Sequence, residues 1–197
     1  MTSLRTSLLA LALALSAAPA FAAPVAYEID GRHTQVHFTY SHFGLSNISG
    51  RFSDVTGTIA FDAADPAASS VKVTIPIDTV STGVAKLDDH LESPDFFDAA
   101  KYPTATFAST AVTAAGENQW KVAGDLTLHG VTRPVVLDAT TNFVGPHPMS
   151  KAPAAGFDAT TTIKRSEFGI DRMIPGVPDE VRIRITLEAK GPKGEAE

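Results

Sequence analysis

Apolar and polar residues alternate along most of this chain, in short runs separated by turn residues. The run over residues 181–188 is the most regular, with valine, isoleucine and leucine at odd positions and arginine, threonine and glutamate at even ones. Side chains of a strand point alternately to the two faces of a sheet, so this period of two predicts strands with one apolar face. Strands of this kind are predicted over residues 35–42, 55–61, 71–78, 105–109, 120–128, 132–144, 157–164 and 181–188.

The interval from 84 to 100 departs from this alternation. Leu87 and Leu91 stand four residues apart, and Phe96 and Phe97 follow Pro94, a spacing that favours a short helix. A loop rich in proline, glycine and alanine is expected over 145–155. Eight antiparallel strands with one apolar face can close into a barrel that holds side chains or one small ligand. The sequence therefore predicts an all-β, eight-stranded antiparallel barrel with a short helical excursion near residues 84–100.

The first 22 residues have the pattern of a signal peptide. Arg5 precedes an apolar run over 8–15, and Ala20 and Ala22 place small residues where signal peptidase reads them. The apolar run is shorter than the roughly 20 residues that a membrane-spanning helix needs. We expect cleavage after Ala22 and a periplasmic protein, with a barrel over 23–190 and a frayed tail over 191–197.

Composition limits the partners. The chain has no cysteine, which excludes both an acylated lipoprotein anchor and a disulfide framework, so no stable membrane anchor is expected. The net charge is −6, and removal of residues 1–22 takes away Arg5 alone among the charged residues. An acidic chain argues against nucleic acid as a partner, because binding nucleic acid depends on neutralising phosphates.

Several short motifs occur in a characteristic order. The most telling is Gly-Asp-Leu-Thr-Leu-His-Gly-Val-Thr-Arg-Pro-Val over residues 124–135. The others are Asp30-Gly-Arg-His-Thr-Gln-Val-His-Phe, Thr82-Gly, Asp88-Asp-His-Leu, Ser93-Pro-Asp-Phe-Phe-Asp, Tyr102-Pro-Thr-Ala-Thr-Phe-Ala-Ser, Ser166-Glu-Phe-Gly-Ile and Asp179-Glu-Val. As a set these motifs, over roughly residues 25–190, resemble the YceI-like family. The resemblance implies a secreted, lipocalin-like barrel that holds a polyisoprenoid or similar amphiphile, such as a prenyl pyrophosphate or an isoprenoid quinone.

A ligand inside such a barrel would contact apolar side chains that face inward or lie at the barrel's mouth. Taken alone, the apolar faces are more typical of packed core, whereas the resemblance favours a cavity. The candidates that alternation places inside are Phe38, Tyr40, Phe61, Ile75, Phe107, Trp120, Leu126, Phe143 and Ile183. The candidates in turns or in the helical excursion are Phe43, Phe97 and Phe168.

A headgroup would need polar partners, for which the candidates are His42, Asp88, His90, Arg165 and Arg172. The acidic balance favours a neutral headgroup such as a quinone, while the two arginines leave an anionic one open. The alternatives are that these arginines are solvated strand residues and that Asp88 and His90 form a hydrogen-bonded clamp for the helical excursion.

We find no catalytic constellation and predict neither catalytic residues nor a metal site. His33 and His37 lie about 13 Å apart if they share a strand, too far for one ion. We therefore expect a binding or carrier protein, not an enzyme, with a bound isoprenoid as ligand and no other cofactor. Two alternatives remain: a stress-induced structural or interaction protein with a filled barrel, and a small metal-dependent enzyme acting on a lipid-like substrate. A homodimer is compatible with the fold, although no exposed apolar stripe demands one.

Overall fold

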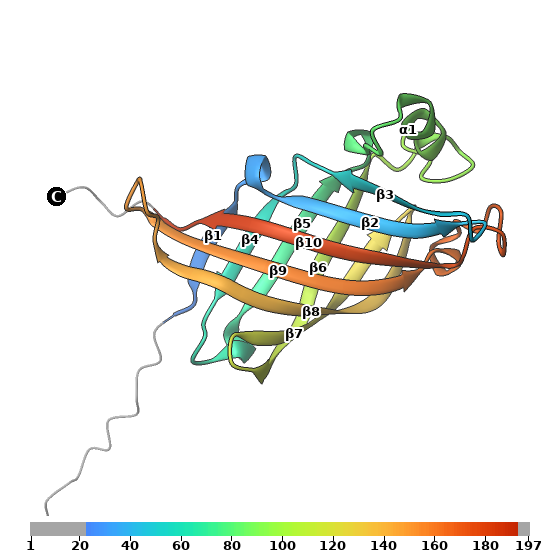
Figure 1. The fold of residues 1–197 in the computed structure, drawn as a ribbon. Coiled ribbons are helices and arrows are strands. Elements are labelled where there is room, and N and C mark those ends of the chain that lie inside the picture. Colours follow the sequence, from blue (N-terminus) through green and yellow to red (C-terminus); the bar gives the residue numbers. More distant parts are fainter. Residues whose placement is uncertain (1–22, 193–197) are drawn as a thin grey trace, which may run out of the picture.

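The alternating runs form one antiparallel sheet that closes on itself (Figure 1). The computed structural model describes residues 23–192; the predicted signal peptide and residues 193–197 of the predicted tail lie outside them. The strands are β1 (Val25–Ile29), β2 (Gln35–His42), β3 (Ser46–Phe52), β4 (Thr56–Phe61), β5 (Ser70–Pro76), β6 (Thr104–Gly116), β7 (Gln119–Leu128), β8 (Val131–Pro146), β9 (Pro153–Lys164) and β10 (Glu180–Lys190). The helices are the α-helix α1 (Ala85–Glu92) and the short 3-10 helices η1 (Gly31–His33), η2 (Pro66–Ala68), η3 (Ile77–Thr79) and η4 (Arg165–Phe168).

The ten strand segments occupy eight positions around the barrel, as the sequence predicts. β1 and β2 both pair with β10, so they are two halves of one strand interrupted by η1. β4 pairs with β1 and β3 pairs with β2, which makes β3 and β4 the halves of the next strand. Every predicted strand lies at an observed one, and α1 forms within the predicted helical excursion. β1 and β3 are additional. β3 has Ile48, Gly50 and Phe52 on its more buried face, but Ile48 and Phe52 are its only large apolar residues.

The long hairpin of β8 and β9 corrects the predicted loop over 145–155. β8 continues to Pro146 and β9 begins at Pro153, so only residues 147–152 connect the two strands. The strand pairing shifts register between Thr141 and Phe143. A β-bulge at that point adds one residue to β8 and exchanges the two faces of the strand beyond it.

A cluster of polar side chains holds the break between β1 and β2 against β10. The carboxylate of Asp30 is nearly buried and lies 2.6 Å from Lys190 Nζ and 3.0 Å from His33 Nδ1. The pKa of Asp30 lies well below its usual range, mainly because its carboxylate accepts a hydrogen bond from Lys190. Thr34, which is fully buried, exchanges hydrogen bonds with the backbone of Glu188 at 3.3 and 3.4 Å. These contacts replace the ladder bonds that the interrupted strand cannot make.

Inside the barrel, apolar side chains form two connected clusters. One contains Val36, Phe38 and Phe52 together with Leu91 of α1. The other contains Tyr27, Ile29, Phe61, Phe107 and Trp120, toward the opposite end of the barrel. Within residues 23–192, no helix is long and apolar enough to cross a membrane.

We predict that Asp30→Asn lowers the free energy of unfolding by about 2 to 3 kcal/mol at pH 7, because a neutral amide replaces the buried charged acceptor of the contacts with Lys190 and His33. A matched control is Asp138→Asn, which removes an exposed ion pair with Lys121 and should cost less than about 1 kcal/mol. Because the folded-state pKa of Asp30 is depressed, its stabilisation is present above about pH 4 and is lost as the pH falls further. Urea unfolding of both variants and the wild type at pH 7 and pH 3 measures this. Equal costs for the two substitutions at pH 7 would contradict the role given to Asp30.

Candidate functional site

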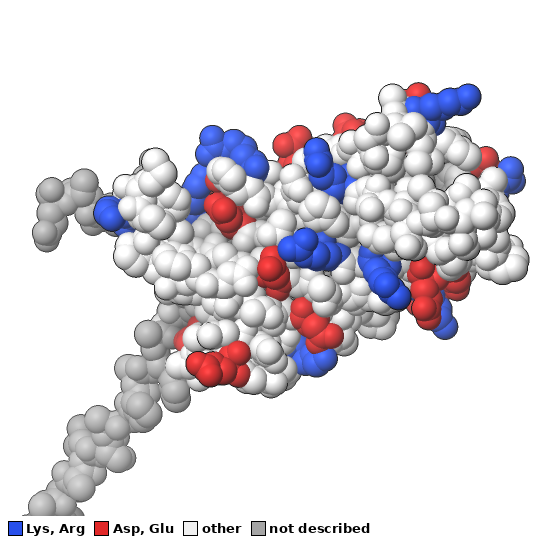
Figure 2. All heavy atoms as spheres, in the orientation of Figure 1, with Lys and Arg blue, Asp and Glu red and all other residues white. Residues whose placement is uncertain are grey.

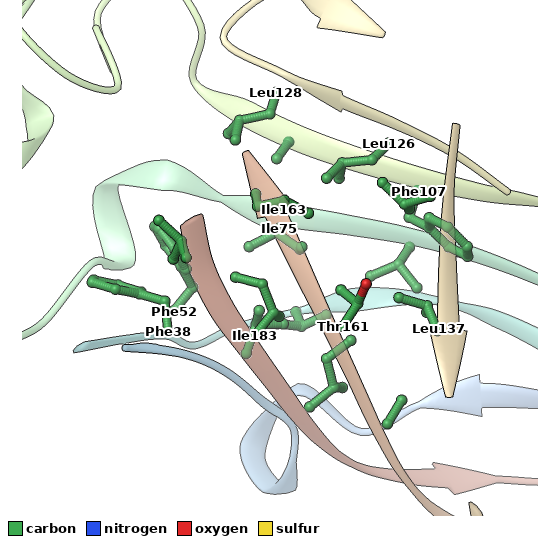
Figure 3. A pocket seen from close by; sticks show the side chains of 18 of the residues that line it. Phe38, Phe52, Ile75, Phe107, Leu126, Leu128, Leu137, Thr161, Ile163 and Ile183 are labelled. Atoms are coloured by element: carbon green, nitrogen blue, oxygen red, sulfur yellow. The ribbon is translucent and has the colours of Figure 1, made fainter. Parts of the chain in front are cut away.

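A cavity of about 350 Å³ occupies the interior of the barrel. Inward-facing aliphatic side chains from several strands form its middle, among them Ile75 of β5, Leu126 of β7 and Ile183 of β10 (Figure 3). Its lining is almost wholly apolar, because it is the same alternating face that the sequence displays.

The structure brings most of the predicted ligand-binding residues together around this cavity. Those that line it are Phe38, Tyr40, Phe61, Ile75, Phe97, Phe107, Trp120, Leu126 and Ile183. Aliphatic positions not singled out from the sequence share the lining, including Leu137 on β8 and Val122 on β7. Alternation within the predicted strands could have found them. That these side chains contact a ligand stays a prediction.

Three of the predicted ligand-binding residues do not line the cavity. Phe143 is 42% exposed on the outer face, since the bulge after Thr141 reverses the alternation that predicted it inside. Phe43 is 52% exposed at the turn between β2 and β3, where its φ of 53° directs the chain out of the strand. Phe168 is fully buried in η4 and belongs to the packed core next to the cavity, not to its lining.

One end of the cavity is filled by aromatic rings. Phe61 meets Trp120 and Phe157 edge to face, with ring centroids 5.4 and 5.2 Å away. The indole Nε1 of Trp120 donates a hydrogen bond to Thr141 Oγ1 at 2.8 Å, which satisfies its buried donor. These rings form an apolar floor.

The opposite end is the mouth, covered in part by α1 and the turn that follows it. His42 and His90 are both exposed and both line the cavity, so it reaches the surface between them. Leu87, Leu91 and Phe96 turn the apolar face of the helical segment toward the interior. The two histidines and the arginine that border the cavity all lie at this end.

Arg165 is the buried cation of the mouth, only 6% exposed. Its guanidinium donates to three backbone carbonyls of the loop that precedes β10, those of Ile170, Val177 and Pro178, at 2.8 to 3.0 Å. Burial lowers its pKa, which the charges of Asp179 and Asp171 oppose. Burial also raises the pKa of the Tyr40 phenol on the cavity wall, and Arg165 works against that rise. Arg165 thus fixes the loop over 170–178 and leaves positive charge near the mouth.

Asp88 and Arg172, both predicted as headgroup contacts, lie off the cavity lining. Asp88 Oδ1 accepts hydrogen bonds from the backbone N–H and the hydroxyl of Thr82, at 2.7 and 2.6 Å. This is the clamp that the sequence left as the alternative for Asp88. Arg172 is exposed, and its Nη2 lies 3.8 Å from Asp95 Oδ2 in the turn after α1. The same carboxylate oxygen lies 3.8 Å from His90 Nε2.

The turn of the motif over 124–135, at His129 and Gly130, lies at the mouth end of the barrel but does not line the cavity. β7 ends at Leu128, and His129 adopts a left-handed conformation with φ 52°. Its Nδ1 is 3.1 Å from the carbonyl oxygen of Phe168, which ties this turn to η4. The ring of Tyr102 lies against Gly130, at a place where a Cβ atom would collide with it. The sequence predicted a turn here but not these contacts between segments far apart in the chain.

A closed antiparallel barrel around an apolar cavity with polar groups at one mouth has the architecture of barrels that hold one small ligand. A model of the YceI-like domain matches residues 27–189. The chain therefore belongs to the YceI-like family. Among residues 23–192, no three histidine, aspartate or glutamate side chains are grouped so that they could hold a metal ion.

Relatives and solved structures agree with this assignment. A UPF0312 protein of Pseudomonas savastanoi pv. phaseolicola is 47% identical over 170 residues, which cover 85% of this chain and 88% of that protein. The crystal structure of Burkholderia cenocepacia BcnA matches with a TM-score of 0.74 at 29% identity, over 81% of this chain and 98% of that one. A polyisoprenoid-binding domain from Saccharophagus degradans, 18% identical, shares the fold with a TM-score of 0.66, over 85% of this chain and 99% of that one.

We predict that Arg165→Met destabilises the protein by about 2 to 4 kcal/mol, because it leaves three carbonyl groups of the mouth without their charged donor. Amide hydrogen exchange should accelerate over residues 170–178 more than in β6 or β7. Arg172→Met is the matched control, since its partner is a single exposed carboxylate, and it should change stability by less than about 1 kcal/mol. Unchanged exchange over 170–178 in the Arg165 variant would show that the guanidinium does not hold this loop.

Proposed function

We propose that this protein binds a polyisoprenoid or a similar long amphiphile in the barrel, chain inward and headgroup at the mouth, and carries it through the periplasm. The observation that carries the proposal is an apolar cavity with its imidazole and guanidinium groups at one end. Its lining on β7 runs from Trp120 to Leu128, about 26 Å of strand at ~3.3 Å per residue. Such a shape suits an extended chain.

The apolar walls can supply the affinity without strong polar contacts. A prenyl chain of about 40 carbons, at a drug-sized efficiency of ~0.3 kcal/mol per heavy atom, gains about 12 kcal/mol. That gain corresponds to nanomolar binding. The headgroup then has only to be oriented by a few groups at the mouth.

The mouth favours a neutral headgroup such as that of an isoprenoid quinone. The phenol of Tyr40 and the imidazoles of His42 and His90 offer donors to a carbonyl oxygen, whereas Arg165 donates three N–H groups to its own loop. A prenyl pyrophosphate is the second candidate, favoured by the positive charge of Arg165, which has no carboxylate within 4.0 Å among residues 23–192.

A binding role agrees with the relatives better than the alternatives do. A filled barrel does not account for a cavity of about 350 Å³, and the polyisoprenoid-binding domain of Saccharophagus degradans has the same fold. We propose a periplasmic location from the signal-peptide pattern of residues 1–22, and a carrier role, not catalysis, from the apolar lining.

Native mass spectrometry of the protein purified from its own periplasm, followed by organic extraction, tests the proposal directly. A stoichiometric isoprenoid is the expected result, and its headgroup separates a quinone from a pyrophosphate. A protein that carries no lipid and takes up neither added ubiquinone nor added prenyl pyrophosphate would refute it.

We predict that Leu137→Trp reduces uptake of ubiquinone by at least about tenfold, because the indole occupies volume within the cavity wall. Val136→Trp on the same strand is the matched control, because Val136 is 51% exposed on the outer face. It should bind as the wild type does. Fluorescence titration, with circular dichroism to verify the fold, measures both; equal uptake by the two variants would place the ligand elsewhere.

A further inference from the structure

Exposed apolar side chains gather at the mouth end of the barrel. Phe43 and Leu45, at the turn between β2 and β3, are 52% and 84% exposed. Met173 and Ile174, in the loop between η4 and β10, are 47% and 38% exposed. We call these four residues the apolar rim. Exposed apolar patches of this kind mark interaction sites more often than scattered single residues do.

The two loops of the rim form one surface. The backbone N–H of Phe43 donates to the carbonyl of Gly176 at 3.0 Å, and the ring of Phe43 lies against Gly176 where a side chain would not fit. Figure 1 shows the β2–β3 turn and the loop before β10 side by side at one end of the barrel. Figure 2 shows that much of the surface at this end carries neither acidic nor basic residues.

The turn of the rim projects from the barrel. A Cβ atom added at Gly44, between Phe43 and Leu45, would meet no atom within 4 Å. The tip of the β2–β3 turn can therefore enter an apolar layer without displacing the rest of the fold.

The rim is continuous with the cavity. Met173 belongs to the rim and also lines the cavity, and His42, next to Phe43, lines it as well. A ligand that leaves the mouth therefore passes directly along the rim. For a long apolar chain, each methylene that crosses open water costs about 0.8 kcal/mol, so an exit that touches an apolar phase avoids that cost.

We propose that the apolar rim inserts into the surface of a lipid bilayer and brings the mouth of the barrel to the membrane. This inference deepens the proposed function and rests on it, because docking at a membrane serves a protein that loads or releases a lipid. Membrane binding itself can be measured whether or not the protein carries a lipid. At roughly 200 Å² for a fully exposed side chain of this size, the rim presents about 400 Å². That is about half of the ~800 Å² that each partner buries in a stable protein interface, which argues against a second copy as the occupant.

Charge favours apolar insertion over electrostatic adsorption. The chain has a net charge of −6, so it gains nothing from anionic lipid as a whole. Beside Met173 lie one acid and one base, Asp171 and Arg172. Binding should therefore occur on neutral phosphatidylcholine and should depend little on salt, because screening weakens only charge interactions.

Flotation with phosphatidylcholine vesicles tests the proposal. The chain is used from residue 23 onward, because the described residues form the whole barrel and the apolar segment 8–15 would itself bind lipid. We expect the wild type to float with vesicles. Leu45→Asp should lower the partition coefficient at least about tenfold, the effect of losing one buried leucine. Leu45 is the most exposed residue of the rim, so this change spares the fold.

A triple variant at the other end of the barrel is the matched control. Phe143, Val144 and Met149 are also exposed apolar residues, and their replacement with serine should leave flotation unchanged. A wild type that fails to float, or a Leu45→Asp variant that floats equally, would overturn the proposal. So would a dimer that Leu45→Asp converts to a monomer, since the rim would then be covered by a second copy.

Ubiquinone uptake from detergent, measured on the same variants, separates this inference from the proposed function. Leu45→Asp should retain uptake while it loses flotation. Flotation without any uptake would leave the rim as a membrane contact and refute the carrier function, whereas uptake without flotation would refute the rim alone.

Discussion

Closure of the sheet on β10 is the constraint on which the rest of this structure depends. β10 pairs along its whole length with β9, and its other edge must pair with an N-terminal strand that is broken in the middle. Thr34 and Asp30 supply the hydrogen bonds that the break removes. Closure leaves β1, β2 and β10 without the open edges that a flat sheet would expose. It also creates an interior that water does not reach from the side.

The interior that closure creates is shaped by where the large side chains lie. A barrel of about eight strands is just wide enough for side chains to fill or for one small ligand. Here the rings of Phe61, Trp120 and Phe157 fill one end, while aliphatic residues line the middle and leave a cavity. The position of the apolar floor gives the cavity a direction, with the imidazoles of His42 and His90 and the guanidinium of Arg165 at the opposite end.

The alternation of the sequence predicted the barrel and most of its lining, because a strand's period of two is a local property of the chain. All of the assigned inward positions on β7 and β10 agree with the structure. The prediction that Phe143 faces inward was wrong, because one residue inserted between Thr141 and Phe143 reverses the inner and outer faces of β8. Nothing in the local composition marks that insertion. β3 was missed because only Ile48 and Phe52 among its seven residues are large and apolar, too few to mark a strand before its pairing with β2 is known. The roles of Asp88 and Arg165 depend on hydrogen bonds to Thr82, six residues away, and to the loop over 170–178. These partners are near in sequence, but strand alternation does not predict the turn and loop conformations that bring them into contact.

The motifs that carry the family resemblance contribute both to the frame of the barrel and to the lining of its cavity, to which they give Phe38, Phe97 and Leu126 among others. Asp30 and Thr34 hold the strand break, and His129 and Gly130 join the turns around the mouth. Arg165, which directly precedes the motif over 166–170, fixes the loop before β10. Between these points the cavity is lined by aliphatic and aromatic residues, some from the motifs and others, such as Val122 and Leu137, from outside them. Resemblance in the motifs is therefore informative about the fold, the position of the mouth and part of the cavity lining. The length and headgroup of the proposed ligand would depend on the complete lining, where leucine, isoleucine and phenylalanine satisfy the same alternation equally well.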